Sequence, residues 1–341
     1  MSIAIIALVA FLGIVALVQV VKVFEVSSDI NKGKENDVTD KDNRTQGALM
    51  LAFMVLFLGG FIWMMLEWGD VLLPKAASIE GAKTDTLMWI SMGLIGFVFF
   101  VTQPILFYFS WKYRGSKNRQ ATYYAHNNRL EALWTIVPAL ALATLIIYGL
   151  TTWIDIMNPE HDEEPLVVEL YARQFDWHAR VAGADNKLGY ANVRFVEGAN
   201  VLGVDPSDEK GKDDIVVREL YLPVNRPVLF KFRAQDVIHS AYMPHFRAQM
   251  NCVPGAITQF SFTPTITTEE MRQRPEVMET VSEIDGIRKG MGEEGYEFDY
   301  VLLCNKICGA AHYNMQMRIV VVTEEEYQQW LKEQKTFAES M

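Results

Sequence analysis

Four long apolar stretches lie in the first 153 residues, and polar segments separate them. They cover Ile3–Val21, Gly47–Leu66, Leu87–Trp111 and Ala132–Trp153. A helix needs about 20 predominantly apolar residues to cross the hydrocarbon core of a bilayer, so each stretch predicts a transmembrane helix. A signal peptide is the alternative for the first stretch. Met1 and Ser2 supply no basic segment before it, which favours a retained helix.

The connecting segments predict the orientation of these helices. Lys and Arg are frequent after the first and third stretches and scarce after the second. The positive-inside rule then places the first and third connections in the cytoplasm. Residues 22–46 show no periodic apolar face and are predicted to form a loop or a surface segment. The part of the chain after residue 154 is predicted to lie on the periplasmic side of a bacterial inner membrane.

The pattern changes after residue 154, where short runs of Val, Leu and aromatic residues alternate with Pro, Gly and Asp. Such runs predict β-strands, and a series of them without long helices predicts an antiparallel sandwich or barrel. The predicted strands are Leu166–Ala172, Val216–Leu222, Val228–Phe232, Ile257–Thr263, Tyr300–Leu303 and Met317–Val322. Thr323, followed by three glutamates, predicts the start of a C-terminal helix.

Residues 264–297 do not follow the strand pattern. They carry nine acidic and four basic residues, and their apolar positions are only weakly helical. A solvated loop or insertion is one interpretation, and a surface that contacts a partner protein is the other.

Charge divides the chain in the same way as hydropathy. The whole chain of 341 residues has a net charge of −11, and residues from 154 onward hold 31 acidic against 19 basic side chains. The sequence therefore combines a membrane part with an acidic, water-soluble part. An acidic surface repels phosphate backbones, so nucleic acid is not an expected partner, and a basic protein is favoured.

The strongest candidate for chemistry is the stretch from Cys304 to Met315. It contains Cys304, Cys308, His312 and Met315, and His239 lies 65 residues upstream. Thiolates, imidazoles and a thioether together suit copper. A zinc site of two cysteines and two histidines is an alternative that leaves the methionine unused. A dithiol redox site is another, and it does not require the histidines.

The third cysteine, Cys252, has no ligand-like neighbours in the sequence and is interpreted as a small buried apolar residue. With only three cysteines, two of them in the candidate metal loop, a disulfide framework is not expected.

The motif Cys-x3-Cys-Gly-x2-His-x2-Met, preceded by Asp-Val-Ile-His-Ser and Val-Pro-Gly, resembles subunit II of the haem-copper cytochrome c oxidases. The resemblance covers about residues 86–335. It implies a cupredoxin-like Greek-key β-barrel that follows the transmembrane helices and holds a binuclear copper centre, CuA. Its ligands would be the side chains of His239, Cys304, Cys308, His312 and Met315 and the backbone carbonyl of Lys306, with both cysteines bridging two copper ions.

The resemblance also assigns roles outside the metal loop. Glu131, in Glu-x-x-Trp-Thr-x-x-Pro, would lie at the mouth of a proton channel into subunit I, and an ordinary interfacial carboxylate is the alternative. Family members often have Gln-Trp-x-Trp where electrons enter, but this chain has Phe175 at the first tryptophan and keeps Trp177. Lys306 replaces a glutamate that helps to hold magnesium, so magnesium is not expected.

The implied function is the electron-accepting subunit of an aerobic terminal oxidase, an oxidoreductase in which subunit I reduces oxygen. The expected partners are oxidase subunits I and III, the lipid bilayer, and cytochrome c or a haem-bearing complex as electron donor. No Cys-x-x-Cys-His motif occurs, so no covalently attached haem is expected in this chain. A quinol-oxidase subunit and a membrane-tethered copper chaperone are the alternative functions.

The expected domains follow from these assignments. Residues 1–85 would form two additional transmembrane helices with a cytoplasmic loop, and residues 86–153 would form the helix pair typical of the family. Residues 154–341 would form the periplasmic copper domain, with the acidic insertion 264–297 and a C-terminal helix.

Overall fold

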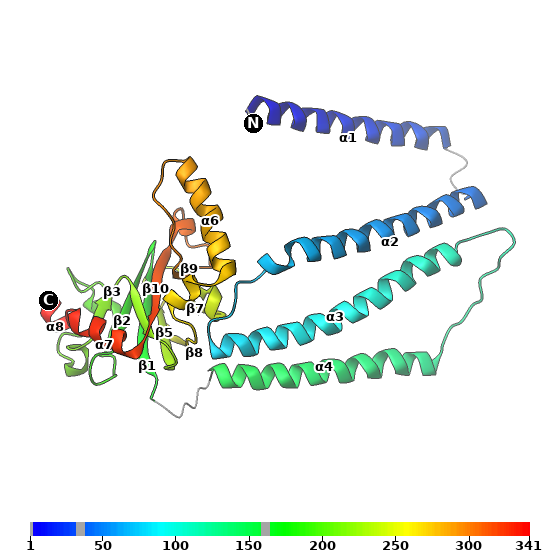
Figure 1. Cartoon of the computed structure of the whole chain (residues 1–341). Coiled ribbons are helices and arrows are strands. Elements are labelled where there is room, and N and C mark those ends of the chain that lie inside the picture. Colours follow the sequence, from blue (N-terminus) through cyan, green and yellow to red (C-terminus); the bar gives the residue numbers. More distant parts are fainter. Residues whose placement is uncertain (1–2, 32–37, 158–163) are drawn as a thin grey trace. The chain divides into compact units, whose positions relative to one another are not determined.

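Four long helices form the described residues of the first part of the chain (Figure 1). The structure, a computed structural model, describes residues 3–31, 38–157 and 164–341. The helices are α1 (Ile3–Asn31), α2 (Asp40–Trp68), α3 (Ile79–Lys112) and α4 (Asn128–Met157). Each contains a segment long and apolar enough to cross a membrane. The four helices expected from the apolar stretches are therefore confirmed.

The loop interpretation of residues 22–46 is wrong for residues 22–31 and 40–46, which are helical, while residues 32–37 lie outside the described part of the chain. Helix α1 continues to Asn31, and α2 already begins at Asp40. Thr39 accounts for the early start of α2, because its hydroxyl accepts a hydrogen bond from the Asp42 backbone N–H and its own N–H donates to the Asp42 carboxylate. This reciprocal capping satisfies two backbone donors of the first turn.

The chain forms two compact units. One comprises Met1–Gly69 and Gly96–Asn127, and the other comprises Asp70–Ile95 and Asn128–Met341. In the first unit, phenylalanine rings line the contact between α2 and the second part of α3. Their centroids are 5.6 to 5.9 Å apart in the pairs Phe53–Phe107, Phe57–Phe99 and Phe61–Phe99.

In the second unit, ten strands form two five-stranded sheets. The first sheet has the order β3-β2-β1-β5-β8 and the second the order β4-β10-β9-β6-β7. The strands are β1 (Leu166–Arg173), β2 (Asp176–Val181), β3 (Ile215–Val217), β4 (Leu220–Pro223), β5 (Val228–Ala234), β6 (His239–Met243), β7 (Ala248–Cys252), β8 (Thr258–Phe262), β9 (Tyr300–Cys304) and β10 (Gln316–Val322). The predicted all-β domain is confirmed.

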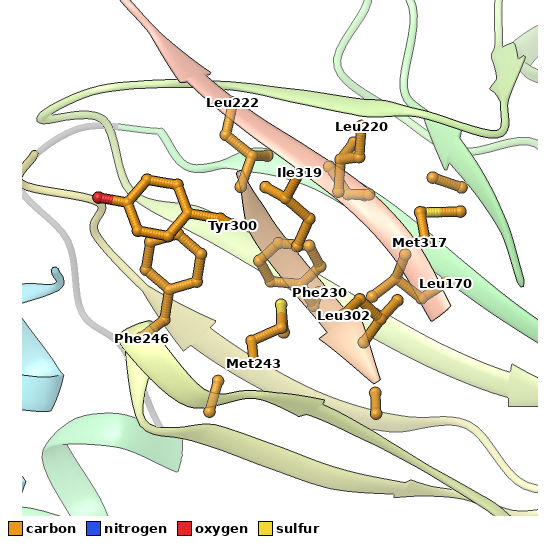
Figure 2. Close-up of a cluster of buried hydrophobic side chains, with 14 of the residues drawn as sticks. Leu170, Leu220, Leu222, Phe230, Met243, Phe246, Tyr300, Leu302, Met317 and Ile319 are labelled. Carbon is orange, nitrogen blue, oxygen red and sulfur yellow. The ribbon is translucent and has the colours of Figure 1, made fainter. Parts of the chain in front are cut away.

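The main apolar core of this β-domain lies between the two sheets (Figure 2). Alternate residues of each strand point into it, as the two-residue period of a strand requires. Phe230 and Phe232 of β5 and Ile319 and Val321 of β10 are fully buried or nearly so. Arg318, between core residues of β10, points to solvent and pairs with acidic neighbours.

The sheets are mixed, so the prediction of an antiparallel sandwich is wrong in this respect. Strand β1 runs parallel to β5, and β10 runs parallel to β4. The predicted strand Val216–Leu222 is in fact two strands: β3 pairs with β2, whereas β4 pairs with β10 in the other sheet. The chain therefore crosses from one sheet to the other at Arg218 and Glu219.

A long connection between β2 and β3 covers the outer face of the first sheet. Beneath it, the buried Arg180 guanidinium hydrogen-bonds to Glu169 at 3.0 Å and to Asp214 at 2.9 Å. Beside this ionic network, a second small apolar cluster contains Tyr171, Leu202, Val204 and Phe337, the last from helix α8 (Phe337–Ser340). Both faces of β1 are consequently buried.

Residues 264–297 contain helices, so the loop interpretation of this segment is wrong. Helix α5 (Thr268–Arg272) begins with a capping pair formed by Thr267 and Glu270, and α6 (Pro275–Gly290) begins with a proline at its first position. The predicted C-terminal helix is α7 (Glu324–Glu333), capped by Thr323 as expected. Trp330 of α7 stacks on Tyr221 of β4, with ring centroids 4.9 Å apart.

The start of α3 is attached to the β-domain. Ser78 forms a β-bridge with Pro264, and its hydroxyl donates to the Phe246 carbonyl at 2.8 Å. The Glu80 carboxylate accepts a hydrogen bond from the Thr263 N–H at 2.7 Å. These contacts make residues 70–95 part of the same compact unit as the strands.

Candidate metal centre

The candidate ligands lie at one end of the second sheet. Cys304 is the last residue of β9, and Met315 immediately precedes β10. The Cys304 N–H donates to the Met315 carbonyl at 3.0 Å, which closes the loop between the two strands. His312 begins a short 3-10 helix inside this loop. The hairpin thus holds two thiols, an imidazole and a thioether at one site.

Strand pairing brings the distant His239 to the same place. His239 begins β6, which lies beside β9, and Ala241 is paired with Cys304. The Asn305 N–H donates to the Ser240 carbonyl at 2.9 Å and extends this pairing into the loop. Side chains at i and i+2 of a strand share a face, so His239 points to the same side as Ala241 and Cys304.

The donor atoms gather around the two sulfurs. Cys304 Sγ lies 3.8 Å from His239 Nδ1 and 3.3 Å from the Lys306 carbonyl oxygen. Cys308 Sγ lies 3.6 Å from His312 Nδ1 and 3.8 Å from Met315 Sδ. The two sulfurs are 3.9 Å apart and form no disulfide. The structure therefore brings together all six residues that the sequence assigned to the metal site.

The chemistry of this donor set fits copper. His239, Cys304 and Cys308 are buried and form a cluster with ligand atoms within 4.8 Å of one another. Thiolate, imidazole and thioether donors favour copper, whereas a structural zinc site uses four thiolate or imidazole donors in a tetrahedron. Burial, followed by the neighbouring Cys304, raises the pKa of the Cys308 thiol to about 11. A metal that binds here must therefore displace a thiol proton.

The two aromatic residues predicted to carry electrons lie beside this site. Trp177 of β2 is only 1% exposed, and its indole N–H donates to the Met315 carbonyl at 3.4 Å. Its ring is inclined by 63° to that of His239, with centroids 6.2 Å apart. Phe175, in the turn between β1 and β2, packs against Gly309 of the metal loop. Trp177 lies beneath the site, so a donor protein cannot touch it directly.

Glu131 does not belong to this cluster. It lies in the first turn of α4, whereas the other end of that helix leads toward the β-domain. A helix of this length spans about 45 Å at 1.5 Å per residue, so Glu131 cannot act directly on the metal ligands.

Sequence reasoning missed two polar residues at the site. The Asp236 carboxylate accepts a hydrogen bond from His239 Nε2 at 2.8 Å and another from the Gln174 N–H at 2.7 Å. Burial raises the pKa of Asp236, but these hydrogen bonds outweigh burial and leave the pKa below its usual value. The spacing of Asp236 three residues before His239 was the available signal.

Two protein-family models match separate parts of this chain. The family model for the cytochrome c oxidase subunit II transmembrane domain matches residues 66–152, and the model for its periplasmic domain matches residues 205–289. The second match ends before the Cys304–Met315 loop, so the ligand assignment rests on the geometry of the site.

Individual relatives agree with the family models. The alternative cytochrome c oxidase subunit 2 of Bradyrhizobium diazoefficiens is 32% identical over 85% of this chain and 93% of its own length. Cytochrome c oxidase subunit 2 of Cereibacter sphaeroides is 25% identical over 69% of this chain and 70% of its own length.

Among solved structures, the periplasmic domain of cytochrome oxidase subunit II from Bradyrhizobium japonicum aligns with a TM-score of 0.30 and 19% identity, over 52% of this chain and 95% of that domain. The family models together with the Bradyrhizobium diazoefficiens relative, which matches along most of both chains, show that this chain belongs to the cytochrome c oxidase subunit II family.

Proposed function

We propose that this chain binds two copper ions and carries electrons from a donor protein to subunit I of a haem-copper oxidase. One observation carries the proposal: the six donors fall into two groups, one around each sulfur. His239 and the Lys306 carbonyl lie beside Cys304, and His312 and Met315 lie beside Cys308. Six donors exceed the four of a tetrahedral site, so a set of two thiols with two further donors beside each would suit a metal pair.

The surrounding fold supports an electron carrier. The copper pair, when bound, supplies a one-electron acceptor and donor. Both ends of the ligand loop are fixed by the hydrogen bonds of Cys304 and Asn305, and the histidine of β6 is held by its strand. Ligands on rigid elements keep their positions when the charge of the site changes. The buried Trp177 lies between His239 and the Met315 carbonyl and extends the conducting path into the domain.

The rest of the chain fits a membrane-bound oxidase subunit. We assign residues 86–153 to the helix pair that contacts subunit I, and residues 154–341 to a copper domain on the periplasmic side of a bacterial inner membrane. Glu131 would accept protons at the cytoplasmic end of α4. The two additional helices in residues 1–85 and the insertion 264–297 would contact other subunits, such as subunit III, or the cytochrome c-type or haem-bearing donor.

Copper stoichiometry and spectroscopy test the proposal. We expect the purified protein to bind two copper ions per chain, with intense thiolate-to-copper absorption and an EPR signal from one electron shared by two nuclei. The Cys308→Ser variant should lose this signal. Cys252→Ser is the matched control, because Cys252 is a buried thiol of β7 and belongs to neither donor group. A single copper, zinc, or no metal in the wild-type protein would contradict the proposal.

A further inference from the structure

Asp236 contacts the His239 imidazole, and Gln174 contacts the backbone of the loop that carries Cys308. Both residues touch the ligand residues and are not themselves in the ligand set. We propose that they are positioning residues: Asp236 fixes the proton of His239, and Gln174 fixes the loop that carries Cys308. We call the two residues the Asp236–Gln174 brace. This inference rests on the proposed copper function, and it gives a role at that site to two residues that the resemblance left without one.

Three donors fix the Asp236 carboxylate. Its Oδ1 accepts from the Val237 N–H at 2.7 Å and lies 2.8 Å from His239 Nε2. Its Oδ2 accepts from the Gln174 N–H at 2.7 Å. The side chain is 30% exposed, so water reaches it only partly. Because both carboxylate oxygens are engaged, the carboxylate has one orientation, and this orientation presents Oδ1 to the imidazole.

The contact with Asp236 determines which nitrogen of His239 is free. The His239 side chain is fully buried, with Nε2 beside the carboxylate and Nδ1 3.8 Å from Cys304 Sγ. A neutral imidazole carries one proton, on either Nδ1 or Nε2. An ionised carboxylate can accept a hydrogen bond but cannot donate one, so the carboxylate of Asp236 favours the proton on Nε2. The Nδ1 lone pair then faces the metal pocket. Carboxylates that orient metal-binding histidines in this way also make the imidazole more basic.

Gln174 connects this carboxylate to the cysteine loop. Its backbone N–H holds Asp236, while its side-chain Nε2 donates to the Cys308 carbonyl. The next residue in the loop, Gly309, has a backbone φ of +145°, a conformation that L side chains rarely adopt. The Gln174 amide therefore holds the loop where the backbone turns sharply behind a ligating sulfur. One residue thus fixes the relative positions of His239 and Cys308.

Gln174 is an exposed residue, so its side chain adds little to the packing of the domain. An effect of its removal on the metal site can therefore be told apart from a loss of stability. The hydrogen bond of this side chain to the Cys308 carbonyl is only partly buried, and one such bond contributes about 1 kcal/mol to the free energy of unfolding. Removal of the side chain should therefore change the metal site far more than the stability of the domain.

Copper release and histidine NMR test the proposal on the full-length protein in detergent. We expect Asp236→Ala to lower copper affinity by about 10- to 100-fold, the range typical for loss of a residue that orients a ligand. Asp236→Asn should lose less, because its amide oxygen can still accept from Nε2–H. Gln174→Ala should lower the affinity by about tenfold and lower the melting temperature of the metal-free protein by no more than about 4 °C.

Asp285→Ala is the matched control for Asp236. Asp285 is 24% exposed, and its carboxylate accepts a backbone N–H from Tyr296 on the α6 insertion, away from the metal loop. Gln259→Ala, an exposed glutamine of β8, is the control for Gln174. Neither control should change copper affinity. Equal loss in the controls, or wild-type affinity in Asp236→Ala, would overturn the proposal.

The tautomer of His239 provides a readout that does not depend on copper. In metal-free wild-type protein, nitrogen NMR should show the proton of His239 on Nε2, and in Asp236→Ala a substantial fraction should move to Nδ1. An unchanged tautomer contradicts the role of Asp236. If the wild-type protein binds no copper, the proposed function fails, and the NMR result still decides whether Asp236 sets the tautomer.

Discussion

Arg247 of the β-domain forms a two-pronged ion pair with Asp85 of α3. Arg247 Nε lies 2.7 Å from Asp85 Oδ1, and Nη2 lies 3.0 Å from Oδ2. The Arg247 Nη1 also donates to the Pro244 carbonyl at 2.7 Å. The two side chains are only 11% and 23% exposed. A planar guanidinium in such a fork is a strong and geometrically specific partner for a carboxylate.

Loss of Asp85 should destabilise the β-domain. We expect Asp85→Ala to lower its free energy of unfolding by about 3 kcal/mol, because a largely buried guanidinium loses its charge partner. Denaturant unfolding in detergent, followed by near-ultraviolet circular dichroism, measures the change.

Lys83 and Asp155 provide the matched control for this ion pair. They also join α3 to another part of the same unit, but their side chains are 52% and 60% exposed and their charged atoms are 3.8 Å apart. Exposed ion pairs contribute about 1 kcal/mol or less, so Lys83→Ala should have a small effect. Equal effects of Asp85→Ala and Lys83→Ala would show that the buried pair has no special importance.

A methyl group at Gly309 should disturb the metal loop. A Cβ atom built there would lie 2.8 Å from Gln174 Nε2 and from two ring atoms of Phe175, and the backbone φ is +145°. Gly309→Ala should therefore displace the loop and lower copper affinity by at least about tenfold. Titration with copper against a competing chelator measures the loss.

Gly286 in α6 is the control for this substitution, because nothing lies within 4 Å of a Cβ atom at that position. Gly286→Ala should leave copper binding unchanged and stabilise the helix by about 0.5 to 1 kcal/mol. Normal copper binding by Gly309→Ala would mean that the loop tolerates the added methyl group.

Lys306 should contribute only its backbone to the metal site. Its carbonyl oxygen lies 3.3 Å from Cys304 Sγ, and its side chain is exposed. Lys306→Ala should therefore keep the copper stoichiometry and the thiolate-to-copper spectrum of the wild-type protein. A lost or strongly shifted spectrum would show that the ammonium group takes part, and Cys304→Ser serves as the variant in which loss is expected.

Asp214 should make the stability of the β-domain depend on pH. Burial raises the pKa of its carboxyl from 3.8 to about 7, although Arg180 and the Gly189 N–H oppose the change. Between these values the folded state keeps a proton that the unfolded state has released. The free energy of unfolding should then fall as the pH rises from about 4 to about 7, by up to about 1.4 kcal/mol per pH unit.

Substitution of Asp214 by Asn removes this titration and keeps an oxygen that can accept from Arg180. The difference between wild type and Asp214→Asn in the pH dependence of denaturant unfolding isolates the contribution of this carboxyl. Parallel pH profiles of the two proteins would contradict the prediction.

The ligand set could be predicted from the sequence because most of it is local. Four of the side chains lie between Cys304 and Met315, and their spacing alone gathers them in one loop. The position of His239 was expected from the family motif, and the pairing of β6 with β9 places it there in the structure. Asp236 lies three residues before His239, a spacing that could have indicated their contact. The role of Gln174 left no such signal, since it depends on contacts between three separate loops.

Strand β2 was absent from the predicted strands, and its residues explain why. Strand β2 carries Asp176, His178 and Arg180, which do not suggest a buried strand. The structure buries His178 and Arg180 because the connection before β3 covers that face and supplies Asp214. Long-range compensation of this kind leaves no periodic pattern in the local sequence.

Helix α6 was also absent from the predicted elements. Its face toward the domain has few apolar residues, and Val277 and Val281 on that face pack against the core. So short an apolar face gives only a weak helical pattern in the sequence.

The attachment of α3 to the β-domain also has a consequence for biosynthesis. Ser78 leaves the ribosome 168 residues before Phe246, to which its hydroxyl is bonded. The start of α3 has no partner in the β-domain until that domain has been completed and folded. Closing so long a loop costs conformational entropy, and only the contacts with the folded β-domain offset this cost. We therefore expect attachment to be a late step of maturation. A nascent chain whose β-domain fails to fold would keep the start of α3 accessible to proteases and quality-control factors.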